Sequence, residues 1–444
     1  MRIRFGELWE RLNTSYWFVP TVMAALGVTL AFGMIRLDQA VSSDLVRRLG
    51  WVYRGGPEGA TGVLTAIAGS MITIAGLVFS LTLVALTLAS SQFGPRLLRN
   101  FIRDRVTQFV MGTFLASFLY CLFVLRTIRR DDGDEFVPHV SVTVGVVLAV
   151  AGLVMLVYFI HHLATSIQAD TLIARVASEL AAATDHLYPE DIGTGTPEPP
   201  APPKPTDPFD TVTAGEDGYV QIVESDRVMA AADRWDVTVE LVHRPGHFVA
   251  AGGPLARVWP AERLDGQLAD EIAQAVVLGP VRTPGQDVEF VMGQLVEVAV
   301  RALSPGINDP FTALTCIDRL AAGLARLARR KPPSPYRLGR DGRLRVLAEP
   351  VRFPDLVDTA FNQIRQYGRG NAAVLIRLLE VLADLAAGVA SAPNRDALRK
   401  HAEMVARAAN ESLPEENDRN DARDRIRTMS DLVRGLDAPA NPPT

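Results

Sequence analysis

The stretch GVLTAIAGSMITIAGLVFSLTLVALTLASSQFGPRLLRNF, residues 62–101, decides the fold of this chain. Most of it lies in an uncharged run, residues 59–95, which exceeds the roughly 20 residues that a helix needs to cross a hydrocarbon core of about 30 Å. Three further runs without Asp, Glu, Lys or Arg lie at residues 16–35, 106–125 and 136–169. Four such runs predict four transmembrane helices in residues 1–170, of which the second and fourth are long enough to extend beyond the bilayer or to tilt.

The composition of the chain is divided in the same way. It has 444 residues, of which 48% are hydrophobic and 21% charged, and its mean hydropathy is +0.15. This value indicates a very apolar first part joined to an ordinary polar part. Cys121 and Cys316 cannot build a disulfide framework or a zinc ribbon. The pattern excludes a simple cytosolic enzyme, a disordered chain and a disulfide-stapled secreted domain, and the net charge of -5 gives no reason to expect nucleic acid as a partner.

The arginines of the short loops predict an orientation. The loop after the second run carries Arg96, Arg99, Arg103 and Arg105 against Asp104 alone. Lys and Arg are enriched in cytoplasmic loops, so we expect this loop, both termini and the large C-terminal part to be cytoplasmic. The first run is expected to be a retained span, because it is longer than the roughly 7–15 apolar residues of a signal peptide and no A-x-A cleavage site follows it.

Small and hydroxyl residues recur about every seven positions along the second run, and polar residues follow at its end. We assign to pore lining or helix packing the residues Gly62, Gly69, Thr73, Gly76, Ser80, Thr87, Ser90, Ser91, Gln92, Arg96 and Arg99. In lipid, small residues let helices approach closely, and hydroxyls can bond across the contact. This face can therefore pack against the other spans of its own chain, pack against further copies in a homo-oligomer, or line a water-filled path.

The end of the second run adds two expectations. A ring formed by Arg96 and Arg99 at the mouth of a path would favour anions, although the same arginines also satisfy the positive-inside rule. Gly94-Pro95 is expected to end or kink the helix, because proline removes a backbone hydrogen bond and disfavours helix in the residue before it. Residues 97–106, LLRNFIRDRV, are then predicted to form a short amphipathic helix at the membrane interface.

The fourth run ends with His161 and His162. Adjacent residues point to different faces of a helix, so these two imidazoles cannot chelate one metal ion from a regular helix. We therefore expect no metal site here, and an interfacial position or a titratable sensor is the preferred interpretation.

The C-terminal part is predicted to hold a β module and a helical domain, so the fold class is a membrane α-helical bundle followed by a cytoplasmic α+β region. Residues 171–209 form a helical extension and a proline-rich linker. In residues 210–259, GYVQIV, VTVELVH and the turn RPGHF predict a small β-barrel-like module. This module has no lysine at a hairpin tip for a prosthetic group, so we expect a structural role.

Apolar residues three and four apart predict a mainly helical domain in residues 260–433. Asp309-Pro310 and Asp355 are expected helix starts, since proline is tolerated at the first helical position. Within this domain SPYRLGRDGRLRVL indicates a β-hairpin. Residues 434–444 are expected to be a disordered tail.

Three loops of the predicted helical domain mix polar residues into apolar surroundings. The candidate ligand or subunit contacts in them are Arg282, Gln286, Asp287, Arg301, Asn308, Asp309, Gln366 and Tyr367. Loops of this composition on a helical scaffold can bind a ligand or another subunit. The simpler alternative is helix capping, because Asn and Asp are favoured N-cap residues.

Sequence motifs for catalysis are absent. The chain has no G-x-x-x-x-G-K-[ST], G-x-S-x-G, H-E-x-x-H or C-x-x-C. We therefore expect no enzymatic activity, no catalytic residue, no cofactor and no metal site. The apolar runs also lack the Asp, Glu, Lys or Arg that marks ion-coupled carriers, which argues against coupled transport more strongly than against a passive channel.

Three motifs carry a family resemblance. GSMITIAGLVFSLTLVALTLASSQFGPRLLRNFIRDRVTQFVMGTF, YFIHHLATSIQ and VRALSPGINDPFTALTCIDRL resemble the family of predicted bacterial membrane proteins catalogued as a domain of unknown function. The resemblance covers nearly the whole chain. It implies placement in a bacterial inner membrane, with a four-span N-terminal part and a cytoplasmic C-terminal part, and it implies no activity and no functional residues.

Two functions fit these observations. The first is a homo-oligomeric, passive, channel-like protein whose second span lines the path and whose cytoplasmic region regulates it, with an anion preference as one version. The second is a non-conducting, membrane-anchored sensor or scaffold that binds a protein partner or a small ligand through its cytoplasmic region. The lipid bilayer and further copies of the chain are the expected partners.

Overall fold

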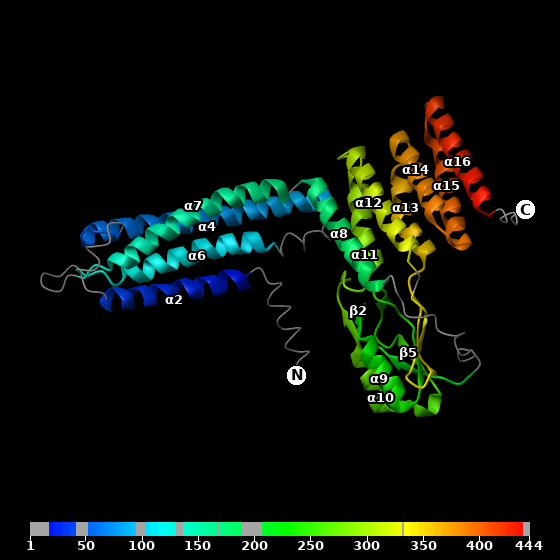
Figure 1. Ribbon diagram of the computed structural model, residues 1–444, viewed down its shortest axis with the longest axis horizontal. Helices are drawn as coiled ribbons and strands as arrows, with labels where there is room; N and C mark the ends of the chain where they lie inside the picture. Colours follow the sequence, from blue (N-terminus) through cyan, green and yellow to red (C-terminus); the bar gives the residue numbers. More distant parts are fainter. Residues whose placement is uncertain are drawn as a thin grey trace, which may run out of the picture. The chain divides into compact units, whose positions relative to one another are not determined.

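The computed structural model describes residues 17–40, 52–94, 104–129, 136–166, 168–188, 207–330 and 333–437. The chain divides into two compact units, Met1–Thr171 and Leu172–Thr444, which we call the N-terminal and the C-terminal unit (Figure 1).

Long helices make up the described part of the N-terminal unit: α2 (Phe18–Ala40), α4 (Pro57–Phe93), α6 (Arg105–Leu125) and α7 (His139–Ser166). Within the described residues these four helices are long and apolar enough to cross a membrane. Their bounds lie within a few residues of the uncharged runs, so the prediction of four helices that could span a membrane is confirmed. The segments between them carry the charged residues that interrupt the apolar runs, which is why charge alone locates the helix ends.

Helix α4 is a single helix of 37 residues, which at 1.5 Å per residue is about 55 Å long and exceeds the thickness of the hydrocarbon core. It ends at Phe93, and Gly94 follows at φ 106°, a conformation that glycine adopts without steric cost. The prediction that Gly94-Pro95 ends this helix is confirmed. Pro95 and most of the predicted interfacial helix at residues 97–106 lie outside the described residues.

Helix α6 is the central element of this bundle, because it packs against α2, α4 and α7. It buries the aromatic rings of Phe114 and Tyr120 completely. A Cβ atom added to Gly27 of α2 would lie 2.6 Å from the backbone oxygen of Ala116, so glycine permits the close crossing of α2 and α6. Asp38 of α2 accepts hydrogen bonds from the backbone N–H of Val140 and Ser141 at 2.9 and 2.8 Å and thereby caps the start of α7.

Two open β-sheets form one part of the C-terminal unit. The larger has the order β1 (Asp210–Thr213), β5 (Pro254–Trp259), β3 (Thr238–Leu241), β8 (Leu344–Ala348) and β7 (Tyr336–Leu338), and only the β3–β8 pair is parallel. The smaller has the order β4 (Phe248–Val249), β2 (Gly218–Val223) and β6 (Val276–Gly279). Helices α9 (Ser225–Trp235) and α10 (Gly266–Ala275) contribute Val228, Leu268 and Ile272 to the core that these strands share.

The prediction of a barrel-like module in residues 210–259 is not confirmed, because neither sheet closes. The strands β6, β7 and β8 come from outside the predicted module, and helix α9 lies inside it. Alternating hydrophobicity predicts that a segment is a strand, but it carries no information on the strand's partner. The pairing of Val239 with Val346 joins residues more than 100 positions apart, which no local pattern reveals.

Helices form the rest of this unit: α8 (Ala169–Leu187), α11 (Val288–Ala302), α12 (Pro310–Ala328), α13 (Phe353–Tyr367), α14 (Ala372–Gly388), α15 (Ala392–Ser412) and α16 (Glu416–Asp437). Helix α12 begins at Pro310 after the N-cap residue Asp309, as predicted. Helix α13 begins at Phe353, two residues before the predicted Asp355. Helix α16 continues to Asp437, so the expected tail begins later than residue 434, and residues 438–444 lie outside the described residues.

Candidate functional site

One side of helix α4 faces its own bundle. Its buried residues include Leu64, Met71, Ala75 and Val78, which recur three and four apart and pack against α6 and α7. Because successive residues of a helix turn by about 100°, this spacing defines one narrow face. The opposite face is therefore available for other contacts.

Small and hydroxyl residues form a line along that opposite face, flanked by the exposed side chains of Leu77, Leu83 and Val84. We call this line the α4 stripe: Gly62, Gly69, Thr73, Gly76, Ser80 and Thr87. All six are exposed. A Cβ atom added to any of the three glycines would meet no atom within 4 Å. Packing of the stripe against the other spans of the same chain, one of the alternatives drawn from the sequence, is therefore not seen among the described helices.

The hydroxyls of the stripe are bonded to their own helix. Thr73 and Thr87 donate to the backbone oxygens of Gly69 and Leu83 at 2.7 and 2.9 Å. Their protons are thus occupied, and the oxygen lone pairs remain as acceptors on the exposed face. The part of the face nearest the C-terminal end of α4 forms a shallow groove of about 390 Å³, lined by Ser80, Leu83, Val84, Thr87, Leu88 and Ser91.

The polar residues at the end of the stripe are only partly visible. Ser91 and Gln92 are exposed and Ser90 is half-buried on the last turns of α4. Arg96 and Arg99 lie outside the described residues. The proposed positive ring at this end is therefore still a prediction from the sequence.

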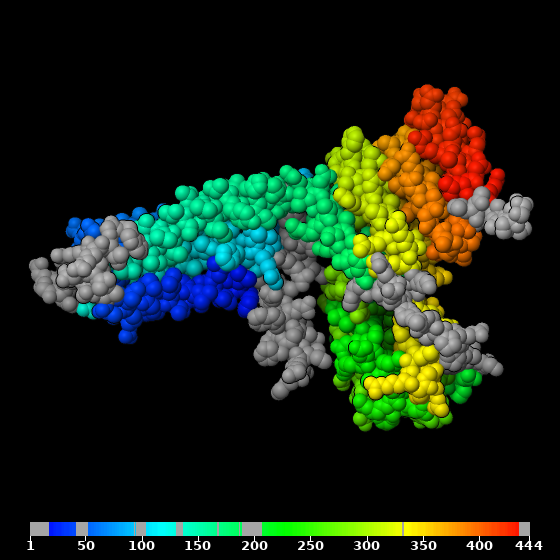
Figure 2. All heavy atoms as spheres, in the orientation of Figure 1, coloured from blue at the N-terminus to red at the C-terminus, as the bar shows by residue number. Residues whose placement is uncertain are grey.

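The outward face of helix α7 has a different chemistry. It exposes large apolar side chains, among them Val147, Val150, Leu153, Val154 and Val157, and α7 covers much of the visible surface of the N-terminal unit in Figure 2. Large apolar side chains are what a lipid-facing surface requires. The glycines and hydroxyls of the α4 stripe do not follow this pattern.

His162 of α7 is bonded to a carboxylate. Its Nε2 lies 2.8 Å from Oδ2 of Asp104, and Asp104 also caps the start of α6 by accepting from the backbone N–H of Thr107 at 3.3 Å. His161 is exposed beside it. Within the described residues no group of three His, Cys, Asp or Glu side chains could hold a metal ion.

The first polar cluster of the C-terminal unit is structural. Asp287 is buried, caps α11 through the backbone N–H of Phe290 at 2.9 Å, and accepts two bonds from Arg282 at 2.7 and 2.8 Å. Gln286 bonds both backbone groups of Val223, at 2.9 and 3.3 Å. These residues satisfy one another and the backbone, which matches the capping alternative.

The other two clusters do not join it. Asp309 caps α12 through the backbone N–H and the hydroxyl of Thr312, at 3.2 and 2.6 Å, and Asn308 adopts φ 50°. Arg301 lies beside Glu297 at 4.0 Å on α11. Gln366 and Tyr367 are exposed at the end of α13. The first and second clusters lie at opposite ends of α11, so the structure does not bring all eight residues into one site.

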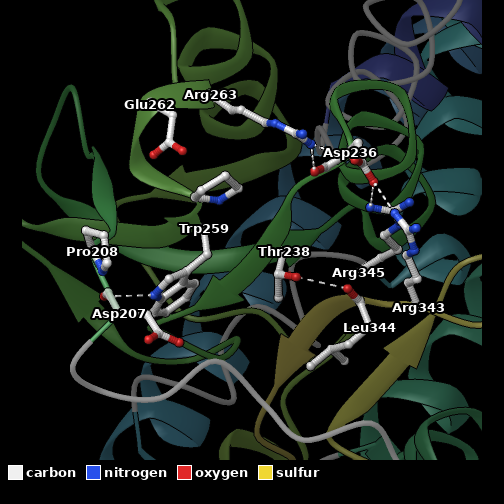
Figure 3. A pocket seen from close by; sticks show the side chains of 11 residues that line it. Asp207, Pro208, Asp236, Thr238, Trp259, Glu262, Arg263, Arg343, Leu344 and Arg345 are labelled. Carbon is white, nitrogen blue, oxygen red and sulfur yellow. Dashed lines mark hydrogen bonds and ion pairs between the residues drawn. The ribbon is translucent and has the colours of Figure 1, made fainter.

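Arginines and aspartates surround an open basin of about 630 Å³ near Trp259 (Figure 3). Asp236, at φ 51°, accepts bonds from Arg263 and Arg345 at 2.7 Å each. Arg345 also contacts Asp233 and Asp341, at 3.1 and 2.8 Å. The hydrogen bonds from Arg263 and Arg345 hold the pKa of Asp236 well below its usual range. Arg263, Arg345 and the three aspartates are paired with one another, so the network ties the β7–β8 hairpin to the end of α9.

A second cavity, of about 410 Å³, has in its wall one of the eight candidate contacts named from the sequence, Gln286. It lies where β3 and β8 end, and we call it the β3–β8 pocket; its wall includes Tyr188, Leu241, His243, His247, Arg337 and Val351. A further local signal for it is the turn RPGHF, because a His on each side of a Pro-Gly turn can bring two imidazoles close together. The strand β8 that completes the wall is distant in sequence.

The turn at this pocket is held by the first polar cluster. Gly246 adopts φ 95°, and a Cβ atom added to it would lie 2.3 Å from Oδ2 of Asp287. Its backbone N–H donates to the oxygen of Val220 at 2.8 Å. The Arg282–Asp287 pair therefore supports the segment that carries His243 and His247.

Comparisons with known proteins give a family but no activity. Residues 13–384 match the family described as "Predicted membrane protein (DUF2254)". Uncharacterized proteins of Mycobacterium bovis and Mycobacterium tuberculosis are each 35% identical to the chain over 419 residues, which cover 92% of this chain and 79% of the relative. No solved structure matches the chain.

Proposed function

Because this chain belongs to the DUF2254 family of predicted membrane proteins, we propose that it is a homo-oligomer in which the α4 helices face one another around a shared axis and line a passive path across the membrane. The observation that supports the proposal is the α4 stripe, which is exposed on the side of α4 opposite its own bundle. We further propose that the membrane is a bacterial inner membrane and that both termini are cytoplasmic, as the loop arginines suggest.

The glycines argue for a contact outside the single chain. Glycine inside a helix costs about 1 kcal/mol relative to alanine, and the stripe has three of them. No described residue of the chain uses the space they leave. Close approach by a helix of a second copy would use it, since small residues are the usual means by which membrane helices pack.

The lining that this arrangement produces is weakly polar. Thr73 and Thr87 would present oxygen lone pairs toward the axis, because their protons are bonded to the helix backbone. These two threonines give anions no donor, so the anion preference in this proposal depends on the end of the stripe, where Gln92, Arg96 and Arg99 follow. The reversal potential in a KCl gradient measures this preference.

A pair of cysteine variants tests the assembly. Gly76→Cys places a thiol on the stripe, and Val154→Cys places one on the outward face of α7, where the native side chain is 63% exposed. The natural Cys121 and Cys316 are free and buried, so they give a low background. We expect mild oxidation of the full-length protein in lipid to cross-link Gly76→Cys into dimers and to leave Val154→Cys monomeric on a gel.

The same variants test the path. In planar-bilayer recordings, a charged thiol reagent should block most of the conductance of Gly76→Cys and should leave that of Val154→Cys unchanged. Absence of cross-linking at Gly76→Cys would contradict the assembly. Cross-linking without any conductance would contradict the path and leave the alternative function.

That alternative is a non-conducting, membrane-anchored sensor or scaffold. The observation that favours it is the β3–β8 pocket, which is a ligand-sized cavity in the C-terminal unit. Neither function includes a catalytic step or a cofactor.

A further inference from the structure

We propose that the β3–β8 pocket binds a small organic anion, with Arg337 bonded to its carboxylate or phosphate group. This inference goes beyond the proposed function, because the pocket belongs to the C-terminal unit alone and binding there does not depend on conduction by α4.

The size and lining of the pocket suit a ligand. Its volume of about 410 Å³ lies within the roughly 300–1,000 Å³ typical of small-molecule sites. Apolar side chains form part of its wall, among them Leu241, Val242 and Val351.

Arg337 is the residue that decides the charge of the ligand. Its guanidinium is half-buried and donates to the backbone oxygen of Ser334. No described carboxylate lies within ion-pair distance of it, and burial lowers the pKa of its guanidinium. A charge removed from water without a counter-charge is costly, and an anion bonded to the planar guanidinium would offset that cost.

Two imidazoles add donors to the same pocket wall. His243 and His247 are half-buried, and their rings lie 5.9 Å apart, edge to face. Neither ring forms a hydrogen bond with another described residue, so each has an N–H free to donate to a ligand. Arg244 adds a third group: it bonds Glu289 at 3.2 and 3.3 Å through one nitrogen, while its buried Nε has no hydrogen-bond partner among the described residues.

The acidic residues in the wall do not cancel these donors. Glu240 is bonded to Arg257 at 3.1 Å, so that pair is neutral. Glu349 is exposed at the rim. Arg337, His243 and His247 are thus left as side-chain donors without a carboxylate partner among the described residues, which selects an anion over a cation.

The wall is held in place without a ligand. Gln286 bonds Val223 on one side, Gly246 rests on Asp287, and the hydroxyl of Tyr188 donates to the backbone oxygen of Val351 at 3.2 Å on the other side. A preformed site loses little conformational entropy when a ligand binds.

Calorimetric titration of the full-length protein in detergent tests the site. The probes are phenyl phosphate and benzoate, with benzyl alcohol as the neutral analogue. We expect saturable binding of at least one anion and no binding of benzyl alcohol. Arg337→Gln should weaken the anion at least tenfold, whereas Arg340→Gln, which removes an exposed arginine of the same hairpin, should bind as the wild type does.

The same titrations can overturn the site. Lack of saturable binding by both anions, equal binding of benzyl alcohol, or unchanged affinity in Arg337→Gln would each refute it. If Arg337→Gln does not fold, Arg337→Lys retains the charge without the fork of donors, and it should bind several-fold more weakly than the wild type; wild-type affinity in that variant would refute the bond to Arg337.

Lipid-embedded protein identifies the source of the anion. Phenyl phosphate affinity is compared in nanodiscs of phosphatidylcholine and in nanodiscs that contain phosphatidylglycerol. Weaker binding with phosphatidylglycerol supports a lipid headgroup as the occupant, and equal binding supports a soluble anion; both results support the anion site.

Discussion

Two arginines of the C-terminal unit differ in the partners of their guanidinium groups. Arg345 is buried among Asp233, Asp236 and Asp341, whereas Arg337 has a single backbone carbonyl as its described partner. Removing one of these aspartates would leave the buried charge of Arg345 less well compensated in a low dielectric, which is costly. Its role in the fold is therefore enough to explain the presence of Arg345. The fold gives Arg337 no such partner, and this difference is our reason for assigning Arg337 to ligand binding and Arg345 to the structure.

Gly246 is the residue on which the turn at the β3–β8 pocket depends. Gly246→Ala should destabilise the C-terminal unit by roughly 1–3 kcal/mol, because alanine is strained at φ 95° and its Cβ would contact Asp287. Gly285→Ala is the matched control, since a Cβ atom there meets nothing within 4 Å. Thermal unfolding of the two variants provides the comparison, and equal melting temperatures would contradict the role given to Gly246.

The histidines of this unit should make the protein less stable in acid. Burial lowers the pKa of His243, His247 and His401 below 6.5. Between that value and the lowered pKa the unfolded chain binds more protons than the folded one, so the free energy of unfolding falls as the pH falls below about 6.5. Asp236, whose pKa is lowered below 3.8, loses its contribution only under that pH.

Melting curves at pH 7.5 and pH 5.5 measure this effect. We expect a melting temperature several degrees lower at pH 5.5, and a smaller difference in His247→Gln, which cannot gain the proton. A wild-type melting temperature that does not change between the two pH values would show that these histidines are not held neutral by the fold.

Helix α4 has two faces that should respond differently to added bulk. Gly69→Leu adds a side chain to the open stripe, so we expect it to leave the melting temperature of the protein in detergent unchanged and to reduce the oligomeric fraction. Ala75→Leu adds the same bulk to the buried face, where Ala75 is 4% exposed, and overpacking there should cost about 1–3 kcal/mol.

Light scattering coupled to size exclusion measures the assembly, and thermal unfolding measures the fold. We expect Gly69→Leu to change the oligomeric state without changing the melting temperature. We expect Ala75→Leu to lower the melting temperature. If Gly69→Leu has the oligomeric state of the wild type, the stripe is not the contact between copies.

At the scale of the whole molecule, the sequence is informative where structure is local. Charge-free runs locate α2, α4, α6 and α7, and the Asp341-Gly342 turn locates the β7–β8 hairpin, with Gly342 at φ 75°. The sheet and the β3–β8 pocket depend on pairing between β3 and β8, which periodicity does not encode. The polar clusters were visible in the sequence, but only the structure separates caps such as Asp287 from a cavity wall.

The parallel pairing of β3 with β8 also constrains how the chain is made. Strand β3 is synthesised about a hundred residues before the partner that covers one of its edges. During translation that edge has no partner strand, and unpaired strand edges are sites where chains associate wrongly. A protein chain whose translation ends before residue 336 would therefore lack strands β7 and β8 of this sheet. Such a truncated chain is expected to aggregate or be degraded.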